Sequence, residues 1–154
     1  MIHCEFMDST LVAAIISAII SGLVSWVVSS LTFRHNDKSC LENELSDILK
    51  IGIEHPYLEQ ESFTSAWEPS KQDKDERYAT YELYATLVFN HLEKRYKFYS
   101  CKLKRVQEEL DMVSWVKLHK AYWTKPTTPH ENILGYNSKF SRMVDNIIKG
   151  KMED

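Results

Sequence analysis

Helix-breaking residues and cysteines are scarce in this chain. Its 154 residues include four glycines, four prolines and three cysteines, and no repeat or low-complexity segment is visible. The shortage of helix breakers excludes a glycine-rich or disordered chain and favours a compact helical protein. The odd number of cysteines and their irregular spacing exclude a disulfide framework and a zinc site.

Motifs with catalytic or cofactor chemistry are also missing. The sequence has no glycine-rich phosphate loop, no H-E-x-x-H zinc pattern, and no serine or cysteine within a nucleophile motif. Its histidines and acidic residues do not follow the spacing of metal ligands. We therefore expect no catalytic residues, no cofactor, no bound metal and no small-molecule substrate.

Charged residues are absent from one long segment near the N-terminus. Residues 11–33 read LVAAIISAIISGLVSWVVSSLTF, 23 positions without an acidic or basic side chain. At about 1.5 Å per helical residue, this segment can cross a bilayer core of roughly 30 Å. The ten residues before it lack lysine and arginine, and no A-x-A-like site follows it, which argues against a cleaved signal peptide. The segment predicts a retained transmembrane helix.

The charges beside this segment predict its orientation. They are Glu5 and Asp8 before it, and Arg34, His35 and Lys38 after it. Because basic residues favour the cytoplasmic side, the protein is expected in the inner (cell) membrane as a single-pass protein. Residues 1–10 then form a short tail outside the cell, residues 11–33 span the bilayer, and residues 34–154 form a cytosolic helical domain.

Small residues form a stripe along the apolar segment. Serines recur every four positions, with two alanines and a glycine on the adjacent row; this small-residue stripe comprises Ala14, Ser17, Ala18, Ser21, Gly22, Ser25 and Ser29. Close backbone approach and hydroxyl hydrogen bonds drive helix association in lipid, so the stripe predicts a homo-oligomer. Two alternatives remain open. The stripe could line a pore within a ring of protomers, or each hydroxyl could bond to the carbonyl four residues earlier.

The part of the chain after the apolar segment is nearly neutral but has one basic run. It holds all 19 lysines and arginines and 20 of the 22 acidic residues, so no global field attracts nucleic acid. The basic run consists of Lys94, Arg95, Lys97, Lys102, Lys104 and Arg105, interleaved with aromatic residues. Such a patch suits RNA or anionic lipid, although a charged helix end is more often simply solvated.

Apolar periodicity predicts an all-α protein, with one N-terminal transmembrane helix followed by a four- to five-helix cytosolic bundle. The predicted segments are a helix over 37–54 that can continue the membrane helix, a short helix over 56–67, a polar loop over 68–75, a long helix over 76–99, a second long helix over 101–124, a break over 125–129 and a last helix from about Ser138. The 76–99 helix has an apolar stripe at Tyr78, Tyr81, Tyr84, Leu87, Val88, His91, Leu92, Arg95 and Tyr99.

One histidine lies between two tryptophans at helical spacing. Trp115, His119 and Trp123 are four residues apart and share one face of a continuous helix. A ligand-binding histidine and a hydrogen-bonded core histidine both fit this pattern. The second interpretation is favoured, because buried amphipathic side chains normally find a partner.

The sequence resembles a loosely defined group of small bacterial proteins with one membrane helix and a cytosolic helical domain. The resemblance rests on His55-Pro56-x-Leu58, on Trp115 with Trp123, and on the break at Pro126–Pro129. The architecture is also similar to the accessory membrane protein of type VI-B CRISPR systems, which has a HEPN-like domain and assembles into a membrane pore. None of the arginines here is followed by histidine in the R-x-x-x-x-H frame of HEPN ribonucleases. The resemblance therefore implies assembly, not RNA cleavage.

Together these observations predict a non-enzymatic membrane effector. It associates with further copies of itself in the bilayer, and the resemblance implies an oligomeric pore acting in phage defence or a stress response. The alternative is a membrane-tethered adaptor whose helical domain binds a cytosolic protein or RNA.

Overall fold

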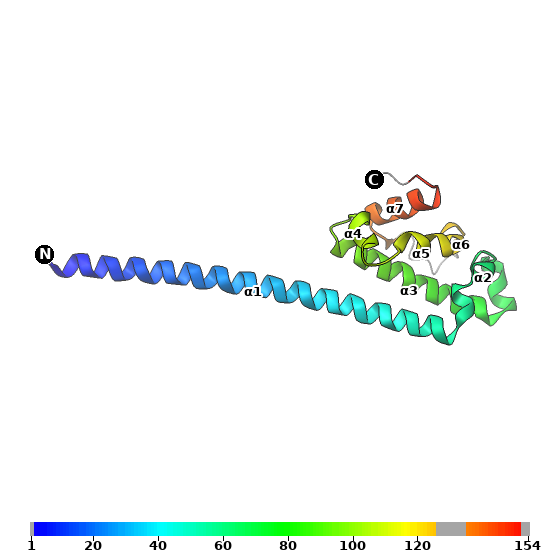
Figure 1. Ribbon diagram of the computed structural model, residues 1–154, viewed down its shortest axis with the longest axis horizontal. Helices are drawn as coiled ribbons and strands as arrows, with labels where there is room; N and C mark the ends of the chain where they lie inside the picture. Colours follow the sequence, from blue (N-terminus) through cyan, green and yellow to red (C-terminus); the bar gives the residue numbers. More distant parts are fainter. Residues whose placement is uncertain (1, 126–134, 152–154) are drawn as a thin grey trace. The chain divides into compact units, whose positions relative to one another are not determined.

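The described secondary structure is entirely helical, which confirms the predicted all-α class. The computed structural model describes residues 2–125 and 135–151 (Figure 1). Two compact units are distinguished, residues 1–40 and residues 41–154. Each is described by itself. The predicted break at Pro126–Pro129 lies outside the described residues.

The first unit is part of one uninterrupted helix, α1 (Ile2–Glu54), which continues into the second unit. No proline interrupts this range, and its helical positions run on through Gly22. Every residue from Leu11 to Cys40 is exposed, including all the large apolar side chains of the uncharged segment. Within the described residues, one helix is thus long and apolar enough to cross a membrane.

The second unit begins with the last part of α1, residues 41–54, and continues through short helical turns. These are η1 (Pro56–Glu59), α2 (Glu61–Thr64) and η2 (Pro69–Lys74). Each 3₁₀ helix starts at a proline, whose fixed φ and missing N–H suit a first helical position. The single helix predicted over 56–67 is therefore two separate turns, and the predicted loop 68–75 contains η2.

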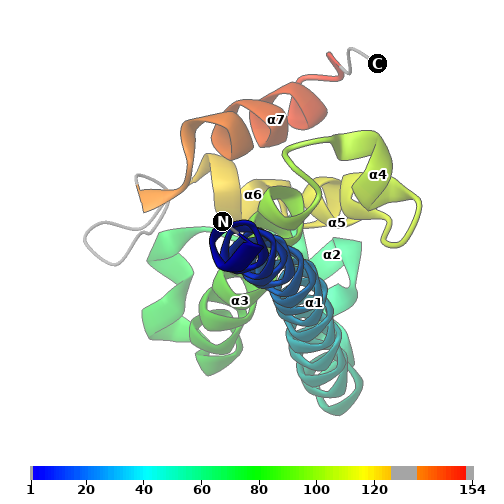
Figure 2. The ribbon, with the colours of Figure 1, turned by 90° about the vertical axis from the view of Figure 1, so that its left-hand side faces the viewer.

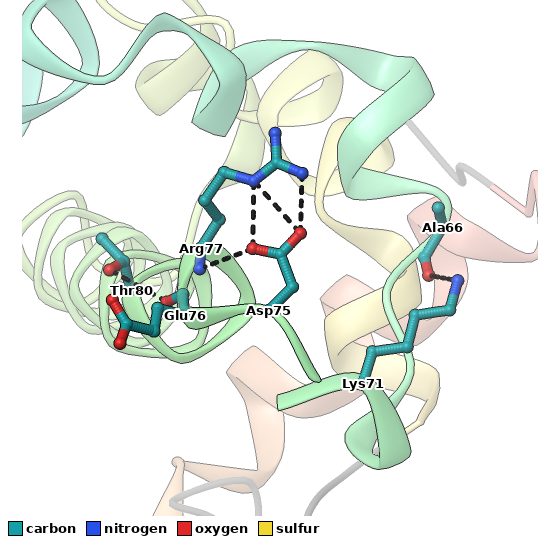
Figure 3. A network of polar contacts seen from close by, with 6 residues as sticks. All are labelled: Ala66, Lys71, Asp75, Glu76, Arg77 and Thr80. Carbon is teal, nitrogen blue, oxygen red and sulfur yellow. Dashed lines mark hydrogen bonds and ion pairs between the residues drawn. The ribbon is translucent and has the colours of Figure 1, made fainter. Parts of the chain in front are cut away.

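The long helix α3 (Glu76–Phe98) begins at a side-chain cap. The Asp75 carboxylate accepts a hydrogen bond from the backbone N–H of Arg77 at 3.0 Å and pairs with the Arg77 guanidinium, as Figure 3 shows. Just before it, Lys71 donates to the carbonyl of Ala66 at 2.8 Å. These contacts satisfy an otherwise free N-terminal amide and set where the polar segment ends and α3 starts.

Helix α3 contributes more buried core residues than any other helix of the described chain, as its apolar stripe predicts. Its buried residues are Tyr81, Tyr84, Ala85, Val88, Phe89, His91, Leu92, Arg95 and Tyr96. The predicted stripe was wrong at Leu87, which is 44% exposed, and Tyr78 and Tyr99 at its two ends are only half-buried against the core. Leu87 lies one position away from the buried row, on the side that faces solvent.

The helix predicted over 101–124 is wrong: the structure has three short helices in this range. They are α4 (Leu103–Gln107), α5 (Met112–Leu118) and α6 (Lys120–Thr124). The chain first leaves α3 through Ser100 and Cys101, whose φ angles of 57° and 60° are left-handed. Asp111 then caps α5 by accepting from the N–H of Ser114 at 3.1 Å. A residue with this capping chemistry favours a new start over continuation of the preceding helix.

Aromatic side chains fill the interior of the second unit, and most of their polar tips are hydrogen-bonded. Trp67, Tyr122 and Trp123 are buried. Tyr122 shares a hydrogen bond of 2.7 Å with Thr86, and the Trp123 indole donates to Asp145 at 3.0 Å. Asp145 lies on α7 (Ser138–Ile148), which packs on α5 (Figure 2). The presence of α7 confirms the helix predicted from about Ser138.

Replacing Ser100 by glycine should stabilise the second unit. A left-handed φ costs a non-glycine residue roughly 1–2 kcal/mol, and glycine removes this cost at an entropic penalty of about 0.5–1 kcal/mol. We expect Ser100→Gly to raise the free energy of unfolding by about 0.5–1 kcal/mol in chemical denaturation. Ser65→Gly is the matched control, since Ser65 is also exposed but has φ −69°. It should be destabilising, and equal effects of the two changes would contradict the assignment.

Candidate functional site

The small-residue stripe lies wholly on the exposed surface of α1. All seven of its residues are exposed, and a Cβ atom added to Gly22 would meet no atom within 4 Å. Further along the same helix, the Thr32 hydroxyl donates to the Val28 carbonyl at 2.9 Å. Open space along the stripe leaves room for another helix at this face.

The basic run does not form a single surface. Arg95 is only 1% exposed and belongs to the interior, which corrects its assignment to a surface patch. Lys94 pairs with Glu44 at 2.5 Å, and Lys97 pairs with Glu93 at 2.9 Å. The remaining cations of the run, Lys102, Lys104 and Arg105, are exposed at and within α4.

Burial of Arg95 creates the first polar cluster of the second unit. The Arg95 cluster comprises Glu42, Glu44, His91, Lys94, Arg95 and Glu109. The Arg95 Nη2 donates to Glu42 at 2.8 Å, and its Nη1 lies 3.7 Å from the Glu109 carboxylate. Its Nε donates to the His91 ring at 3.0 Å. A buried guanidinium is tolerated only with such partners, and here they come from α1, α3 and the turn after α4.

The contacts of His91 determine its tautomer. Because its Nε2 accepts the Arg95 hydrogen, the ring proton of neutral His91 is on Nδ1, which faces the Glu44 carboxylate at 3.5 Å. Burial, reinforced by the adjacent Arg95 charge, lowers the pKa of His91. Partial burial alone would raise the pKa of Glu44, but Lys94 and His91 together hold it below its ordinary value. At neutral pH the cluster therefore holds a neutral His91 and an ionised Glu44.

A second cluster surrounds Glu59, at the end of η1. The Glu59 cluster comprises Glu59, Tyr81, Tyr84, Trp115 and His119. One carboxylate oxygen accepts from the Tyr84 hydroxyl, and the other accepts from the Trp115 indole at 3.1 Å. The fully buried His119 lies with its Nε2 3.7 Å from Glu59 and its Nδ1 3.1 Å from the Tyr81 hydroxyl. The cluster thus connects η1, α3 and α5.

The Glu59 carboxylate orders the donors around it. Burial alone would raise its pKa, but His119, Tyr84 and Trp115 outweigh burial and hold the pKa below its ordinary value. The His119 Nδ1 lies at hydrogen-bond distance, 3.1 Å, from the Tyr81 hydroxyl, and its Nε2 faces the carboxylate. Burial, together with the Glu59 charge, raises the pKa values of Tyr81 and Tyr84, so both hydroxyls stay protonated and remain donors.

Gly52 lets α1 approach this cluster closely. A Cβ atom at this position would lie 3.2 Å from the Tyr84 hydroxyl and 3.6 Å from Cγ of Glu59. The first distance is shorter than an ordinary van der Waals contact, and the Tyr84 hydroxyl is held in place by Glu59. The small residue at 52 therefore permits the packing of α1 at this point.

His119 is a core histidine, as the sequence favoured, but the predicted continuous face is broken. Trp115 lies on α5 and Trp123 on α6, and His119 joins these two helices with φ −99° and ψ 18°. Trp123 is buried, whereas Trp115 is only half-buried. The partners of His119 are Tyr81 and Glu59, which the spacing of four residues did not indicate.

Neither cluster resembles a site for a metal. The described residues contain no group of three or more histidine, cysteine, aspartate or glutamate side chains placed to hold an ion. One shallow depression in the described part is lined by Asn90, Glu93, Gly135 and Tyr136. Its polar groups already serve the fold: Tyr136 donates to Asn90 at 2.9 Å, and Glu93 accepts from the N–H of Asn137 at 2.6 Å.

Sequence reasoning missed both polar clusters. A local signal existed for one pair, since His91 and Arg95 are four residues apart on one helix and therefore meet. The carboxylates that complete the clusters are distant in sequence: Glu42 lies 53 positions before Arg95, and Glu59 lies 56 positions before Trp115. Only the tertiary fold brings these groups together.

Comparison with known proteins adds no assignment to this geometry. No family model, no curated protein and no solved structure matches the chain.

Removing one donor from Glu59 should destabilise the second unit and alter its acid sensitivity. Tyr84→Phe leaves the partly buried carboxylate with one donor fewer, at an expected cost of about 1–3 kcal/mol in chemical denaturation. The Glu59 pKa lies below 4.5 in the folded state, so its contribution to stability is complete above pH 4.5 and is lost below it. The variant should therefore lose less stability on acidification than the wild type.

Tyr57→Phe is the matched control for this experiment, because Tyr57 is a half-buried tyrosine outside the Glu59 cluster. We expect a change within about 0.5 kcal/mol, as for substitutions away from buried networks. A cost for Tyr84→Phe no larger than that of the control would contradict the role given to this hydroxyl.

Proposed function

We propose that this protein is a single-pass membrane effector without enzymatic activity that associates with copies of itself through α1. The observation that carries the proposal is the uncharged segment 11–33 with the small-residue stripe exposed along it. In lipid, helices gain little from hiding apolar surface, so close approach at small residues is what brings them together. An oligomeric pore in phage defence or a stress response is the more specific form of this proposal, and it follows from the resemblance alone.

The second unit supports a binding or assembly role more than a catalytic one. Among the described residues, the buried side chains of His91, Arg95 and His119 each have a hydrogen-bonded neighbour within the Arg95 or Glu59 cluster. A catalytic group needs a site where a substrate can reach it. We therefore propose that the helical domain functions by presenting interaction surfaces.

Replacing Ser21 and Ser25 by leucine tests self-association directly. Two large side chains on the stripe would block close approach, so the mass of the detergent-purified protein, measured by light scattering, should fall towards that of one chain. The matched control is Ile19→Leu with Val27→Leu, on the opposite side of the helix, which should keep the wild-type mass. A wild-type protein that is already monomeric would contradict the proposal.

Leakage of a dye from vesicles separates the pore from simple packing. If the stripe lines a water-filled lumen, the same double change should preserve the mass and abolish leakage, because a narrow apolar constriction dewets. If the stripe packs helix against helix, both the mass and any leakage should fall. Retention of both properties would mean that the serines face lipid.

The proposed topology places the N-terminal tail outside the cell and the helical domain in the cytoplasm. A membrane-impermeant maleimide added to intact cells should label Cys4 and spare Cys40, which lies in the exposed part of α1 after the apolar segment. After permeabilisation, Cys40 should react as well, which shows that it is accessible in itself. Labelling of Cys40 alone in intact cells would reverse the topology.

A membrane-tethered adaptor is the second candidate, because the helical domain exposes apolar side chains. Leu83 and Leu87 lie four residues apart on α3 and are 70% and 44% exposed, and Ile53 is 78% exposed. Such side chains suit a protein partner, whereas the exposed Lys102, Lys104 and Arg105 suit RNA. The mass measurement discriminates the candidates, since an adaptor of this kind is expected to remain a monomer in detergent.

A further inference from the structure

We propose that the Arg95 cluster is an acid-sensitive latch: protonation of His91 breaks its hydrogen bond with Arg95 and releases residues 41–54 of α1 from α3. This inference concerns regulation within the helical domain. It does not depend on self-association or on membrane activity.

The first step of the argument is the position of His91. The ring is 1% exposed and lies between the Arg95 guanidinium, whose Nε donates to it at 3.0 Å, and the Glu44 carboxylate, 3.5 Å away. Protonation would place a hydrogen on Nε2, which now accepts. Two donors and two positive charges would then face each other at 3.0 Å, inside the protein, so this hydrogen bond cannot persist.

The second step of the argument is the set of ion pairs that Arg95 forms with other elements. The Arg95 guanidinium connects α3 to α1 through Glu42, at 2.8 Å, and to the turn after α4 through Glu109, at 3.7 Å. A shift of the guanidinium away from a protonated His91 would disturb both ion pairs. Lys94 and Glu44 form a further charged link between α1 and α3, at 2.5 Å near the surface.

The third step is the weak apolar attachment of residues 41–54. Leu41 and Ile48 are the buried apolar residues of this segment, and Ile51 packs against the core partly buried, whereas α3 contributes seven buried apolar residues. At about 1.5–3 kcal/mol for each fully buried side chain, and less for Ile51, these contacts hold the segment only modestly. The polar latch therefore has a large share in keeping it closed, and the segment can open without the aromatic core.

The charges that face His91 set the direction of the response. Glu44 and Glu42 of α1 favour the protonated ring, Arg95 opposes it, and burial opposes it most strongly, so its pKa lies below 6.5 in the closed state. In the released state the ring regains its ordinary pKa. Acid therefore favours the released state. The effect begins below pH 6.5 and no longer grows once His91 is protonated in the closed state as well. The pKa of Glu44 lies below 4.5, so its own protonation occurs at lower pH.

Hydrogen exchange of the full-length protein in detergent tests the latch. Amide protection of residues 41–54, corrected for the pH dependence of intrinsic exchange, should fall by up to about tenfold between about pH 7.5 and about pH 5.5. Peptides from α5 and α7 should keep their protection, because the aromatic core stays folded. Constant protection of residues 41–54 over this range would overturn the proposal, and so would a parallel loss in all helices.

Three variants assign the response to His91. His91→Gln can accept from Arg95 and donate towards Glu44 at every pH, so protection of residues 41–54 should become independent of pH in this range. Glu44→Gln removes a charge that favours protonation of the closed state, so the loss of protection should continue to a lower pH than in the wild type. His55→Gln is the control, since His55 is exposed just after α1 and its replacement should leave the wild-type response. A wild-type response in His91→Gln, or its absence in His55→Gln, would overturn the latch.

Discussion

The second unit depends on the burial of one positive charge. A guanidinium with 1% exposure is stable inside a protein only when carboxylates and a ring nitrogen take over the hydrogen bonds of water. Arg95 obtains these partners from residues far apart in the chain, Glu42 on α1 and Glu109 after α4, together with His91 one turn earlier on α3. The requirement to pair this charge therefore defines how the end of α1 and the turn after α4 meet α3.

The Glu59 cluster likewise connects the N-terminal half of α3 to neighbouring elements. A single carboxylate, which accepts hydrogen bonds from Tyr84 and Trp115 and lies 3.7 Å from His119, connects the turn after α1 to α3 and to the junction of α5 and α6. Gly52 permits the close approach of α1 at this point. Partly buried networks of this kind define orientation well, because each unpaired member costs the desolvation of a polar group. They explain why a domain rich in short helices has a defined interior.

The two units follow different physical rules. In residues 11–33 the side chains are apolar or small and exposed, so in the proposed function contacts with lipid and with other helices supply the stabilisation that a core supplies elsewhere. In residues 41–154 the stabilisation comes from buried aromatic rings and paired charges. Our proposals assign self-association to the first unit and the presentation of interaction surfaces and the response to acid to the second. The proposed polar latch lies within the second unit, at the buried imidazole of His91.

Features that depend on neighbouring residues could be read from the sequence. The all-α class, the long apolar helix, the starts of α3 and α7 and the buried row of α3 follow from the absence of breakers and from spacings of three and four. The division of 101–124 into three helices, the carboxylate partners of Arg95 and the partners of His119 were missed. The physical reason is the range of the interactions. Capping by Asp111 competes locally with helix continuation, whereas Glu42 and Glu59 reach partners more than 50 positions away, and only the folded chain brings them within hydrogen-bonding distance.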